Sequence, residues 1–200
     1  MINRIRGIFR SRCLVSLFLF FVYGCGQGGS FDNARVAHVY DGDTIRLTDG
    51  TKVRLIGIDC PETRDNDKLR ADARRSGQNL KEIMERGRRA YLFTRGLVSG
   101  RRVQLELGQE PQDKYGRTLA YVWIELDRFD PDEGRALPDY FVVESRADAQ
   151  GKERAFVFLN ATIMKAGYAR PMIIPPNTRY EKEMRSYYHL ARQNRWGLWK

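Results

Sequence analysis

The stretch VRLIGIDCPET, residues 53–63, decides how this chain folds and where its chemistry lies. It begins as an apolar strand and ends in a turn that presents two carboxylates, Asp59 and Glu62, with Cys60 beside the first of them. A single arginine, Arg54, interrupts the apolar strand. Because a charged side chain is costly to bury without a partner, a guanidinium in such a strand indicates a site as well as a core.

The segment before this stretch predicts a hairpin that brings a further carboxylate to the arginine. Residues 49–50 are Asp-Gly, which is a strong signal for a two-residue turn between strands. If the turn sets Thr48 opposite Thr51, Asp43 and Arg54 lie on the same face of the hairpin as diagonal neighbours. The sequence therefore predicts that an acid and an arginine project from the same side of two adjacent strands.

The order of elements predicts a small β-barrel. Apolar patterning and turn signals predict strands at 34–40, 43–47, 51–58, 101–107 and 116–126, with a helix at 80–98. Residues 64–73 are polar and are expected to form a loop, 127–154 reads as an inserted loop with room for a hairpin, and short helices are expected at 155–167 and after 175–176. Three strands, a helix and two strands suit a five-stranded barrel of the OB type, so we expect a mainly β fold with α-helices.

Composition indicates a globular protein with a basic surface. Of the 200 residues, 42% are hydrophobic and 30% are charged, which excludes a disordered chain. The net charge is +10, and arginines in the first 24 residues supply four of these charges, which leaves +6 on the remainder. A basic surface favours polyanions such as nucleic acid or anionic lipid, although such a charge is equally typical of a surface that only confers solubility.

The N-terminus has the pattern of an export signal. The basic segment MINRIRGIFRSR precedes the apolar run LVSLFLFFVYG, which is shorter than the roughly 20 residues that span a bilayer. The run ends in VYGC, which resembles the bacterial lipoprotein signal, in which a cysteine after a small residue becomes the lipidated first residue. We therefore expect a signal peptide at 1–24, lipidation of Cys25 and a tether at 25–33. An ordinary cleaved signal and an uncleaved anchor remain as alternatives.

These features predict an exported lipoprotein that is anchored to the membrane on its periplasmic or cell-surface side. Cys13 lies in the signal and Cys25 would carry lipid, so Cys60 is left without a partner. No intramolecular disulfide framework is therefore expected, despite the exported context.

Three segments carry residue types that suit phosphodiester hydrolysis: YDGDTI at 40–45, RLIGIDCPE at 54–62 and DKYGR at 113–117. The substrate is anionic, and its transition state gathers further negative charge that a divalent cation and fixed arginines can neutralise. Asp43 and Asp59 supply hard oxygen ligands for Ca²⁺. The planar forks of Arg54 and Arg117 can each donate two hydrogen bonds to phosphate oxygens. Glu62 follows on a rigid turn, where a carboxylate can orient or deprotonate water.

Each of these residues also has a purely structural interpretation. Acids beside Gly42 are typical of turns. Arg54 with Asp43 could be a structural ion pair, and Glu62 and Arg117 could be ordinary surface residues. Taken together, however, two acids and an arginine converge by strand geometry, which favours a site.

At these residues the sequence resembles the staphylococcal nuclease (thermonuclease) family. The motifs that carry the resemblance are VYDGDTIRL, VRLIGIDCPET and DKYGRTLAYVW, and the closing segments LNATIMKAGYAR and GLW also match. The resemblance covers residues 34–199, with 127–154 as an insertion. It implies an OB-fold barrel with three helices and Ca²⁺-dependent cleavage of DNA and RNA that leaves 3′-phosphate ends. No protein partner is predicted, and we expect a monomer.

The resemblance also implies roles for single residues. Asp43 and Asp59 match the metal carboxylates of the family. Cys60 stands where a Thr or Cys lends its backbone carbonyl to the metal. Arg54 and Arg117 match the pair of phosphate-binding arginines.

Three further residues match the family around the substrate. Glu62 matches the carboxylate assigned to water activation, and Lys114 and Tyr115 match residues that contact the terminal phosphate of the nucleotide. The chain departs from the family at 171–177, where PMIIPPN replaces a segment with two tyrosines that line the base pocket. An inherited base preference is therefore not expected.

Two other functions stay open on the sequence alone. A non-catalytic nucleic-acid-binding module of the same fold would use basic faces, such as those around 74–75 and 88–89. A thiol enzyme would use Cys60 with His38 or His189, but Pro61 follows the cysteine and no acid–His pair is visible. The intact acids favour the nuclease.

Overall fold

The computed structural model describes residues 30–77, 79–126, 137–147 and 151–200. The predicted signal peptide at 1–24 and the lipidation of Cys25 lie outside these residues, as does the part of the insertion at 127–136. Within the described ranges, none of the helices combines the length and the apolar character needed to cross a bilayer.

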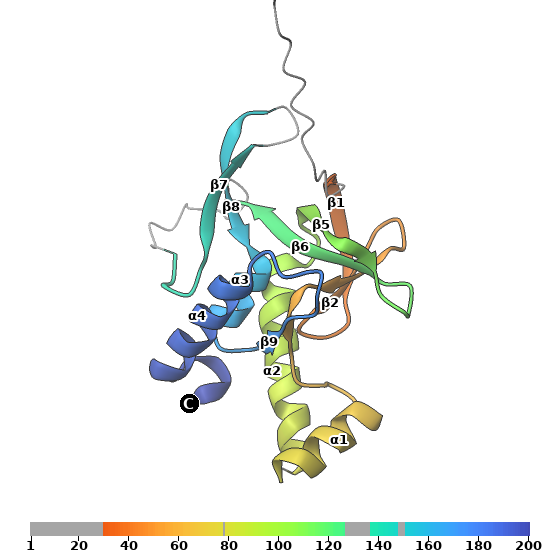
Figure 1. Cartoon of the computed structure of the whole chain (residues 1–200), viewed down its shortest axis with the longest axis vertical. Helices are drawn as coiled ribbons and strands as arrows, with labels where there is room; N and C mark the ends of the chain where they lie inside the picture. The colour runs from red at the N-terminus through yellow and green to blue at the C-terminus, as the bar shows by residue number, and fades with distance from the viewer. Residues whose placement is uncertain (1–29, 78, 127–136, 148–150) are drawn as a thin grey trace, which may run out of the picture.

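Five strands form a closed ring of pairings, which is the barrel predicted from the order of elements (Figure 1). They are β1 (Ser30–Val39), β2 (Thr44–Leu47), β3 (Lys52–Leu55), β5 (Arg102–Gln112) and β6 (Thr118–Glu125). Antiparallel pairs join them in the order β3, β2, β1, β5, β6, and a parallel pairing of β3 with β6 closes the ring. Fully buried residues from several of these strands, such as Ile45, Val53 and Val122, form the core inside it. The strand β1 begins at Ser30, so it includes the last residues of the expected tether.

The β2–β3 hairpin does not have the predicted register. Arg54 pairs with Thr44, one residue away from the register that sets Thr48 opposite Thr51. The loop holds three residues rather than two, and its last residue, Gly50, has a φ of +91°. A left-handed residue at this position is typical of three-residue hairpin loops, which explains why the two-residue assumption was wrong.

The described part of the insertion contains a hairpin. β7 (Val143–Ala147) pairs with β8 (Glu153–Phe158), and β8 pairs with β6, so the hairpin extends the barrel sheet. Residues 155–158 therefore belong to a strand, and the helix expected from 155 begins only at Leu159, as α3 (Leu159–Lys165). The run from Phe156 to Phe158 is buried throughout. A continuously buried run does not show by periodicity whether it is a strand or a helix.

The long helix α2 (Leu80–Val98) forms as predicted, but the expected loop at 64–73 is wrong because α1 (Asp67–Ser76) occupies most of it. The Asn66 side chain accepts a hydrogen bond from Leu69 N–H at 2.8 Å, and Gly77, with φ of +67°, ends the helix. Leu69 is its one fully buried apolar anchor among the side chains described. So weak an apolar pattern explains why the polar segment reads as a loop.

The remaining elements lie on one side of the barrel. α4 (Glu181–Gln193) and the 3₁₀ turn η2 (Gly197–Trp199) end the chain beside α3, and the described residues thus contain four α-helices rather than three. Two short strands, β4 (Gly57–Asp59) and β9 (Arg170–Met172), pair separately from the barrel. β4 continues directly from β3, so it carries the acidic turn out of the barrel and toward the helices (Figure 1).

Candidate active site

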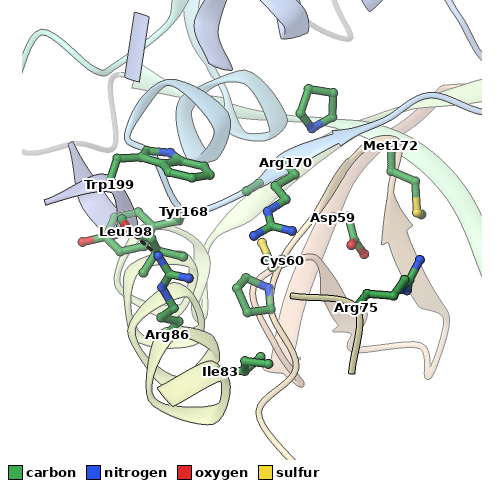
Figure 2. Close-up of a pocket in the computed structure, with 13 residues that line it drawn as sticks. Asp59, Cys60, Arg75, Ile83, Arg86, Tyr168, Arg170, Met172, Leu198 and Trp199 are labelled. Carbon is green, nitrogen blue, oxygen red and sulfur yellow. Dashed lines mark hydrogen bonds between the residues drawn. The ribbon is translucent and has the colours of Figure 1, made fainter. Parts of the chain in front are cut away.

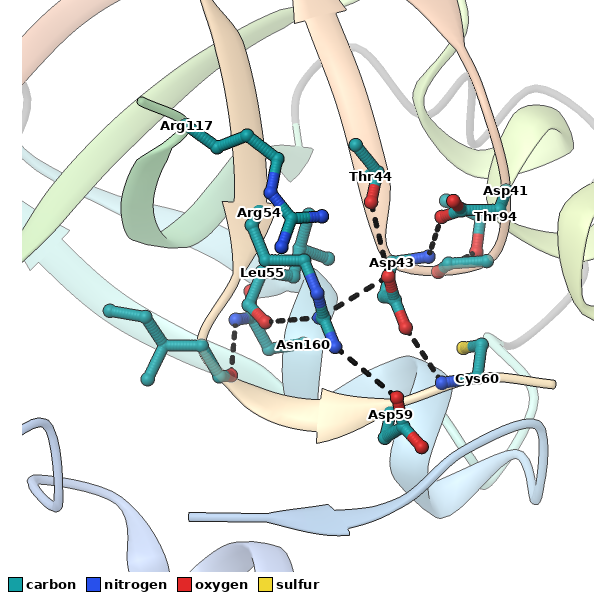
Figure 3. A network of polar contacts seen from close by, with 12 residues as sticks. Asp41, Asp43, Thr44, Arg54, Leu55, Asp59, Cys60, Thr94, Arg117 and Asn160 are labelled. Atoms are coloured by element: carbon teal, nitrogen blue, oxygen red, sulfur yellow. Dashed lines mark hydrogen bonds and ion pairs between the residues drawn. The ribbon is translucent and has the colours of Figure 1, made fainter. Parts of the chain in front are cut away.

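The predicted pair of Arg54 and Asp43 is present and buried (Figure 3). Arg54 Nη1 lies 3.2 Å from Asp43 Oδ1, and Arg54 Nη2 lies 3.4 Å from Asp59 Oδ1. The side chains of Arg54 and Asp43 are only 6% and 7% exposed. Nη1 also donates a hydrogen bond to the Leu55 carbonyl at 2.8 Å. The strand can bury this guanidinium because two carboxylates and a carbonyl surround it.

Asp43 reaches Arg54 from a bend before β2 and not from the strand face that the predicted register gave. Its N–H donates to Asp41 Oδ1 at 3.0 Å, which is a local turn of the kind that Asp favours. Its Oδ2 accepts the Cys60 N–H at 2.7 Å, and its Oδ1 accepts the Thr44 hydroxyl at 3.2 Å. The bend and the acidic turn after β4 are therefore joined through one carboxylate.

Two glycines allow the turns of the site to approach so closely. A Cβ at Gly42 would lie 2.5 Å from the Cys60 sulfur, and a Cβ at Gly87 of α2 would overlap the Glu62 carbonyl oxygen. The hydroxyl of Thr94, also on α2, donates to the Gly42 carbonyl at 2.8 Å. Helix α2 therefore supports both acidic turns from behind. Nothing in the sequence indicated this role for Gly42, Gly87 or Thr94.

A buried asparagine fixes the strand that carries the site. Asn160, on α3, accepts the Val122 N–H and donates to the Ile56 carbonyl, both at 2.9 Å. These bonds join the junction of β3 and β4 to β6. The sequence signal for this role is an asparagine within the otherwise apolar helix LNATIMK, where it is fully buried and therefore needs hydrogen-bond partners.

The second predicted arginine lies in the turn between β5 and β6. Arg117 Nε donates to Asp113 Oδ2 at 2.7 Å, and Asp113 Oδ1 accepts the Arg117 N–H at 3.0 Å. The side chain of Arg117 is 29% exposed, and Figure 3 shows its guanidinium directed toward Arg54. Asp113, which the sequence interpretation left without a role, therefore orients this arginine.

Glu62 and Arg117 line a pocket of about 270 Å³ together with Asp41 and Thr44. The Glu62 carboxylate accepts a hydrogen bond from the Asn66 side chain at 3.0 Å, so the residue that caps α1 also holds Glu62. The structure thus brings the buried Asp43, Arg54 and Cys60 together with the partly exposed Asp59 in one cluster, and Glu62 and Arg117 into the pocket beside it.

Lys114 and Tyr115 lie outside this pocket lining. Both are exposed, and Tyr115 is 72% exposed at the tip of the β5–β6 turn. The Lys114 ammonium lies 5.1 Å and the Arg117 guanidinium 5.5 Å from the Tyr115 ring centroid. They are available to a ligand that extends from the pocket along this turn.

The electrostatics of the cluster reflect crowded negative charge in a buried place. The pKa of Asp43 is raised to about 7, because burial together with Asp41 and Asp59 raises it by more than Arg54 and the Cys60 N–H lower it. Burial works to lower the pKa of Arg54, but Asp43 and Asp59 outweigh it and the pKa is raised. Arg54 therefore stays charged, and the cluster favours any additional positive charge.

The thiol of Cys60 is poorly suited to catalysis. Burial raises the pKa of Cys60 well above its ordinary value, and Asp43 adds to the increase. The residue is only 4% exposed. Because the thiolate is the reactive form, the structure disfavours a thiol enzyme.

Fold and site together define a class of protein: an OB-type barrel in which a buried arginine is held between aspartates, beside a pocket with a second arginine and a glutamate. Comparison with known proteins identifies the family. Residues 52–200 match the family model described as Staphylococcal nuclease homologue, and the chain belongs to this family. The resemblance seen in the motifs is thereby confirmed.

Three relatives illustrate the range of similarity. The chain is 30% identical over 168 residues to a thermonuclease of Staphylococcus intermedius, which covers 82% of this chain and 74% of that protein. It is 27% identical to a thermonuclease of Staphylococcus hyicus with the same coverage. It is 25% identical over 172 residues to the endonuclease YncB of Bacillus subtilis, covering 84% of this chain and 61% of that protein.

Proposed function

We propose that this protein is a nuclease that hydrolyses the phosphodiester bonds of DNA and RNA with the help of Ca²⁺ and leaves 3′-phosphate ends. The observation that carries the proposal is the buried Arg54 between Asp43 and Asp59, next to the pocket of Glu62 and Arg117. Membership of the family and the nuclease names of its relatives support it.

The donor set at the cluster fits a hard cation. Asp43 and Asp59 would hold it, with the Cys60 carbonyl, water and the substrate phosphate completing the shell, since calcium accepts such mixed oxygen ligands. Protein side chains alone do not form the site, because no group of three or more His, Cys, Asp or Glu residues in the described part of the chain could hold a metal. The raised pKa of Asp43 is consistent with a carboxylate that a cation would stabilise. When bound, the cation supplies positive charge against the developing negative charge of the phosphate.

Side chains of the protein bind the phosphate and activate the attacking water. Arg54 and Arg117 bind phosphate oxygens from two sides, and their guanidinium groups stay charged and carry five donors each. Glu62 lines the same pocket, where it orients a water molecule and accepts its proton. Lys114 and Tyr115 contact the next phosphate along the strand.

Cleavage of single-stranded DNA by the full chain in mild detergent tests the proposal. We expect cutting in Ca²⁺, no cutting in excess chelator, and recovery when Ca²⁺ is restored. Products should carry 3′-phosphates and free 5′-hydroxyls, so a polynucleotide kinase should phosphorylate their 5′ ends without prior phosphatase treatment. Cutting that persists in chelator would contradict the mechanism. Binding without cutting in Ca²⁺, Mg²⁺ or Mn²⁺ would instead identify a binding module that uses the exposed arginines of α1 and α2.

We further propose that the protein is exported and anchored by lipid on Cys25, on the basis of the segment that ends in VYGC. The protein should partition into the membrane fraction, and the Cys25→Ser variant should lose both this partition and the mass of the attached lipid. A Cys13→Ser variant is the matched control, because it should keep both. Equal behaviour of the two variants would contradict the proposal.

A further inference from the structure

A second and larger cavity opens on the other side of Asp59 (Figure 2). Its volume is about 480 Å³, within the range of about 300–1,000 Å³ that is usual for small-molecule sites. Its walls come from the acidic turn after β4, from α1 and α2, from the segment around β9 and from the end of the chain at 198–199.

The lining of this cavity is basic and aromatic. It contains three arginines, Arg75, Arg86 and Arg170, against one acid, Asp59, and it includes the rings of Tyr168 and Trp199. Basic side chains interleaved with aromatic rings are what proteins use to bind a single nucleic-acid strand, because the phosphates need positive charge and the bases stack on rings.

The arginines of the cavity differ in their contacts with the rest of the protein. Arg86 donates to the Leu198 carbonyl at 3.0 Å, so it also holds the chain end in place. Arg170 lies opposite Asp59 in the β4–β9 pair and is exposed, and Figure 2 shows its guanidinium above Cys60. Arg170 is thus the arginine of this cavity best placed to meet a ligand that comes from the catalytic cluster.

The cavity and the candidate active site share one wall. Asp59 lines the cavity and also contacts Arg54, whereas Glu62 and Arg117 line the smaller pocket toward the β5–β6 turn. A phosphate held between Arg54 and Arg117 therefore has room on two sides, one toward Lys114 and Tyr115 and one toward Arg170. A phosphodiester within a strand requires such room, since it carries a nucleotide on each side.

We propose that the cavity is a nucleotide subsite, which takes the nucleotide on the far side of the scissile phosphate from Lys114 and Tyr115. The phosphate of this nucleotide lies on Arg170 and Arg75, and its base packs against Tyr168 and Trp199. The assignment rests on the proposed nuclease function and extends it: the preferred substrate is a single strand with nucleotides on both sides of the cleaved bond.

Two substrates distinguish the contribution of this subsite to cleavage from that of the rest of the active site. One is a single-stranded DNA of about eight nucleotides, which can fill both sides. The other is thymidine with a phosphate at the 3′ position and a nitrophenyl ester on its 5′-phosphate, which places no nucleotide in the cavity. The ratio of kcat/KM for the long substrate to that for the short one measures the contribution of the cavity. Arg170→Ala should lower this ratio about tenfold through KM, and Arg170→Lys should restore part of it.

Arg102→Ala is the matched control, because Arg102 is an exposed strand arginine that does not line the cavity. The ratio should stay at the wild-type value in this variant. If Arg170→Ala changes the ratio no more than Arg102→Ala does, the subsite is refuted. Thermal unfolding of each variant identifies any general loss of folded protein.

A binding experiment in chelator does not depend on catalysis. Arg170→Ala should weaken binding of the octanucleotide about tenfold and that of thymidine 3′,5′-bisphosphate much less. If this pattern appears but no variant cuts DNA in any metal, the subsite stands and the proposed nuclease activity fails. If both ligands lose affinity equally, Arg170 does not form a separate subsite and the inference is overturned.

Discussion

Arg54 and Arg117 are both proposed to bind the same phosphate, but the molecule holds them in opposite ways. Arg54 is 6% exposed and is fixed by Asp43, Asp59 and the Leu55 carbonyl. Arg117 is 29% exposed and is held by Asp113, a residue of its own turn. One half of the site is part of the core, and the other half is an addition to its surface.

The difference teaches that the same chemical role can have different consequences for folding. A buried charge that loses its partner is costly, so removing one member of the Arg54 cluster disturbs the fold as well as the chemistry. A partly exposed pair such as that of Arg117 with Asp113 contributes less to stability, so Arg117 can be optimised mainly for substrate. Four variants test this contrast, and we describe them from the largest expected effect to the smallest.

Arg54→Ala should lower the free energy of unfolding by about 3–5 kcal/mol and abolish cleavage, because it leaves the buried carboxylate of Asp43 and the partly buried carboxylate of Asp59 without their cation. Urea unfolding in the absence of metal measures the stability. Arg46→Ala, at an exposed position of the neighbouring strand β2, is the control and should change stability by less than about 0.5 kcal/mol. A loss of under 1 kcal/mol in Arg54→Ala would show that the cluster is not part of the core.

Arg117→Ala should reduce kcat by about 10²–10³, because a positioned donor to the transition state is removed. Its free energy of unfolding should change by less than about 1 kcal/mol, since the lost pair with Asp113 is partly exposed. Steady-state kinetics and urea unfolding on the same preparation give both values. Activity within tenfold of wild type would mean that Arg117 was assigned wrongly.

Gly87→Ala should destabilise the protein by about 1–3 kcal/mol, because the new methyl group would overlap the backbone beneath Glu62. Gly96→Ala in the same helix should change the free energy of unfolding in the opposite direction. A Cβ there meets nothing within 4 Å, so this variant should be more stable by about 0.5–1 kcal/mol. Thermal unfolding distinguishes the two. Equal stabilisation by both would show that α2 does not support the Glu62 turn.

Asp113→Asn should have the smallest effect on stability, under about 1 kcal/mol at pH 7. Burial works to raise the pKa of Asp113, but hydrogen bonds from Arg117 and Tyr115 outweigh it and the pKa is lowered. A lowered folded-state pKa stabilises the fold above the ordinary Asp pKa, and this contribution is lost as the pH falls through the folded-state value. The melting temperatures of wild type and variant should therefore converge only when the pH falls below the lowered pKa of Asp113, which lies under the ordinary Asp value. A difference that persists there would mean that the carboxylate charge is not responsible.

The sequence predicted those parts of the protein that depend on local patterns. The alternating strands, the regular apolar spacing of α2 and the site motifs each lie within one continuous segment of the chain, so they predicted the barrel and most of the site. The pairing of Asp43 with Arg54 was confirmed even though the hairpin register was wrong, because Asp43 reaches the arginine from a bend.

The errors arise where one short segment depends on a distant one. Helix α1 has few apolar residues of its own, so its polar segment was interpreted as a loop. The strand at 155–158 is buried from Phe156 to Phe158, and only its pairing with β6 and β7 identifies it as a strand. The supporting roles of Asn160, Thr94 and Gly87 involve contacts over 25 to 104 residues of sequence, as the bond from Asn160 to Ile56 shows.

By itself, the sequence determined which acids and arginines are present and that three motifs stand in an order typical of one family. Only the tertiary structure decided how they are used. It buried Arg54 and left Arg117 partly exposed, and it enclosed the cavity beside Asp59 between α1, α2, β9 and the chain end. The physical reason is that residue type and spacing are local properties, whereas burial and enclosure depend on which distant segments pack against each other.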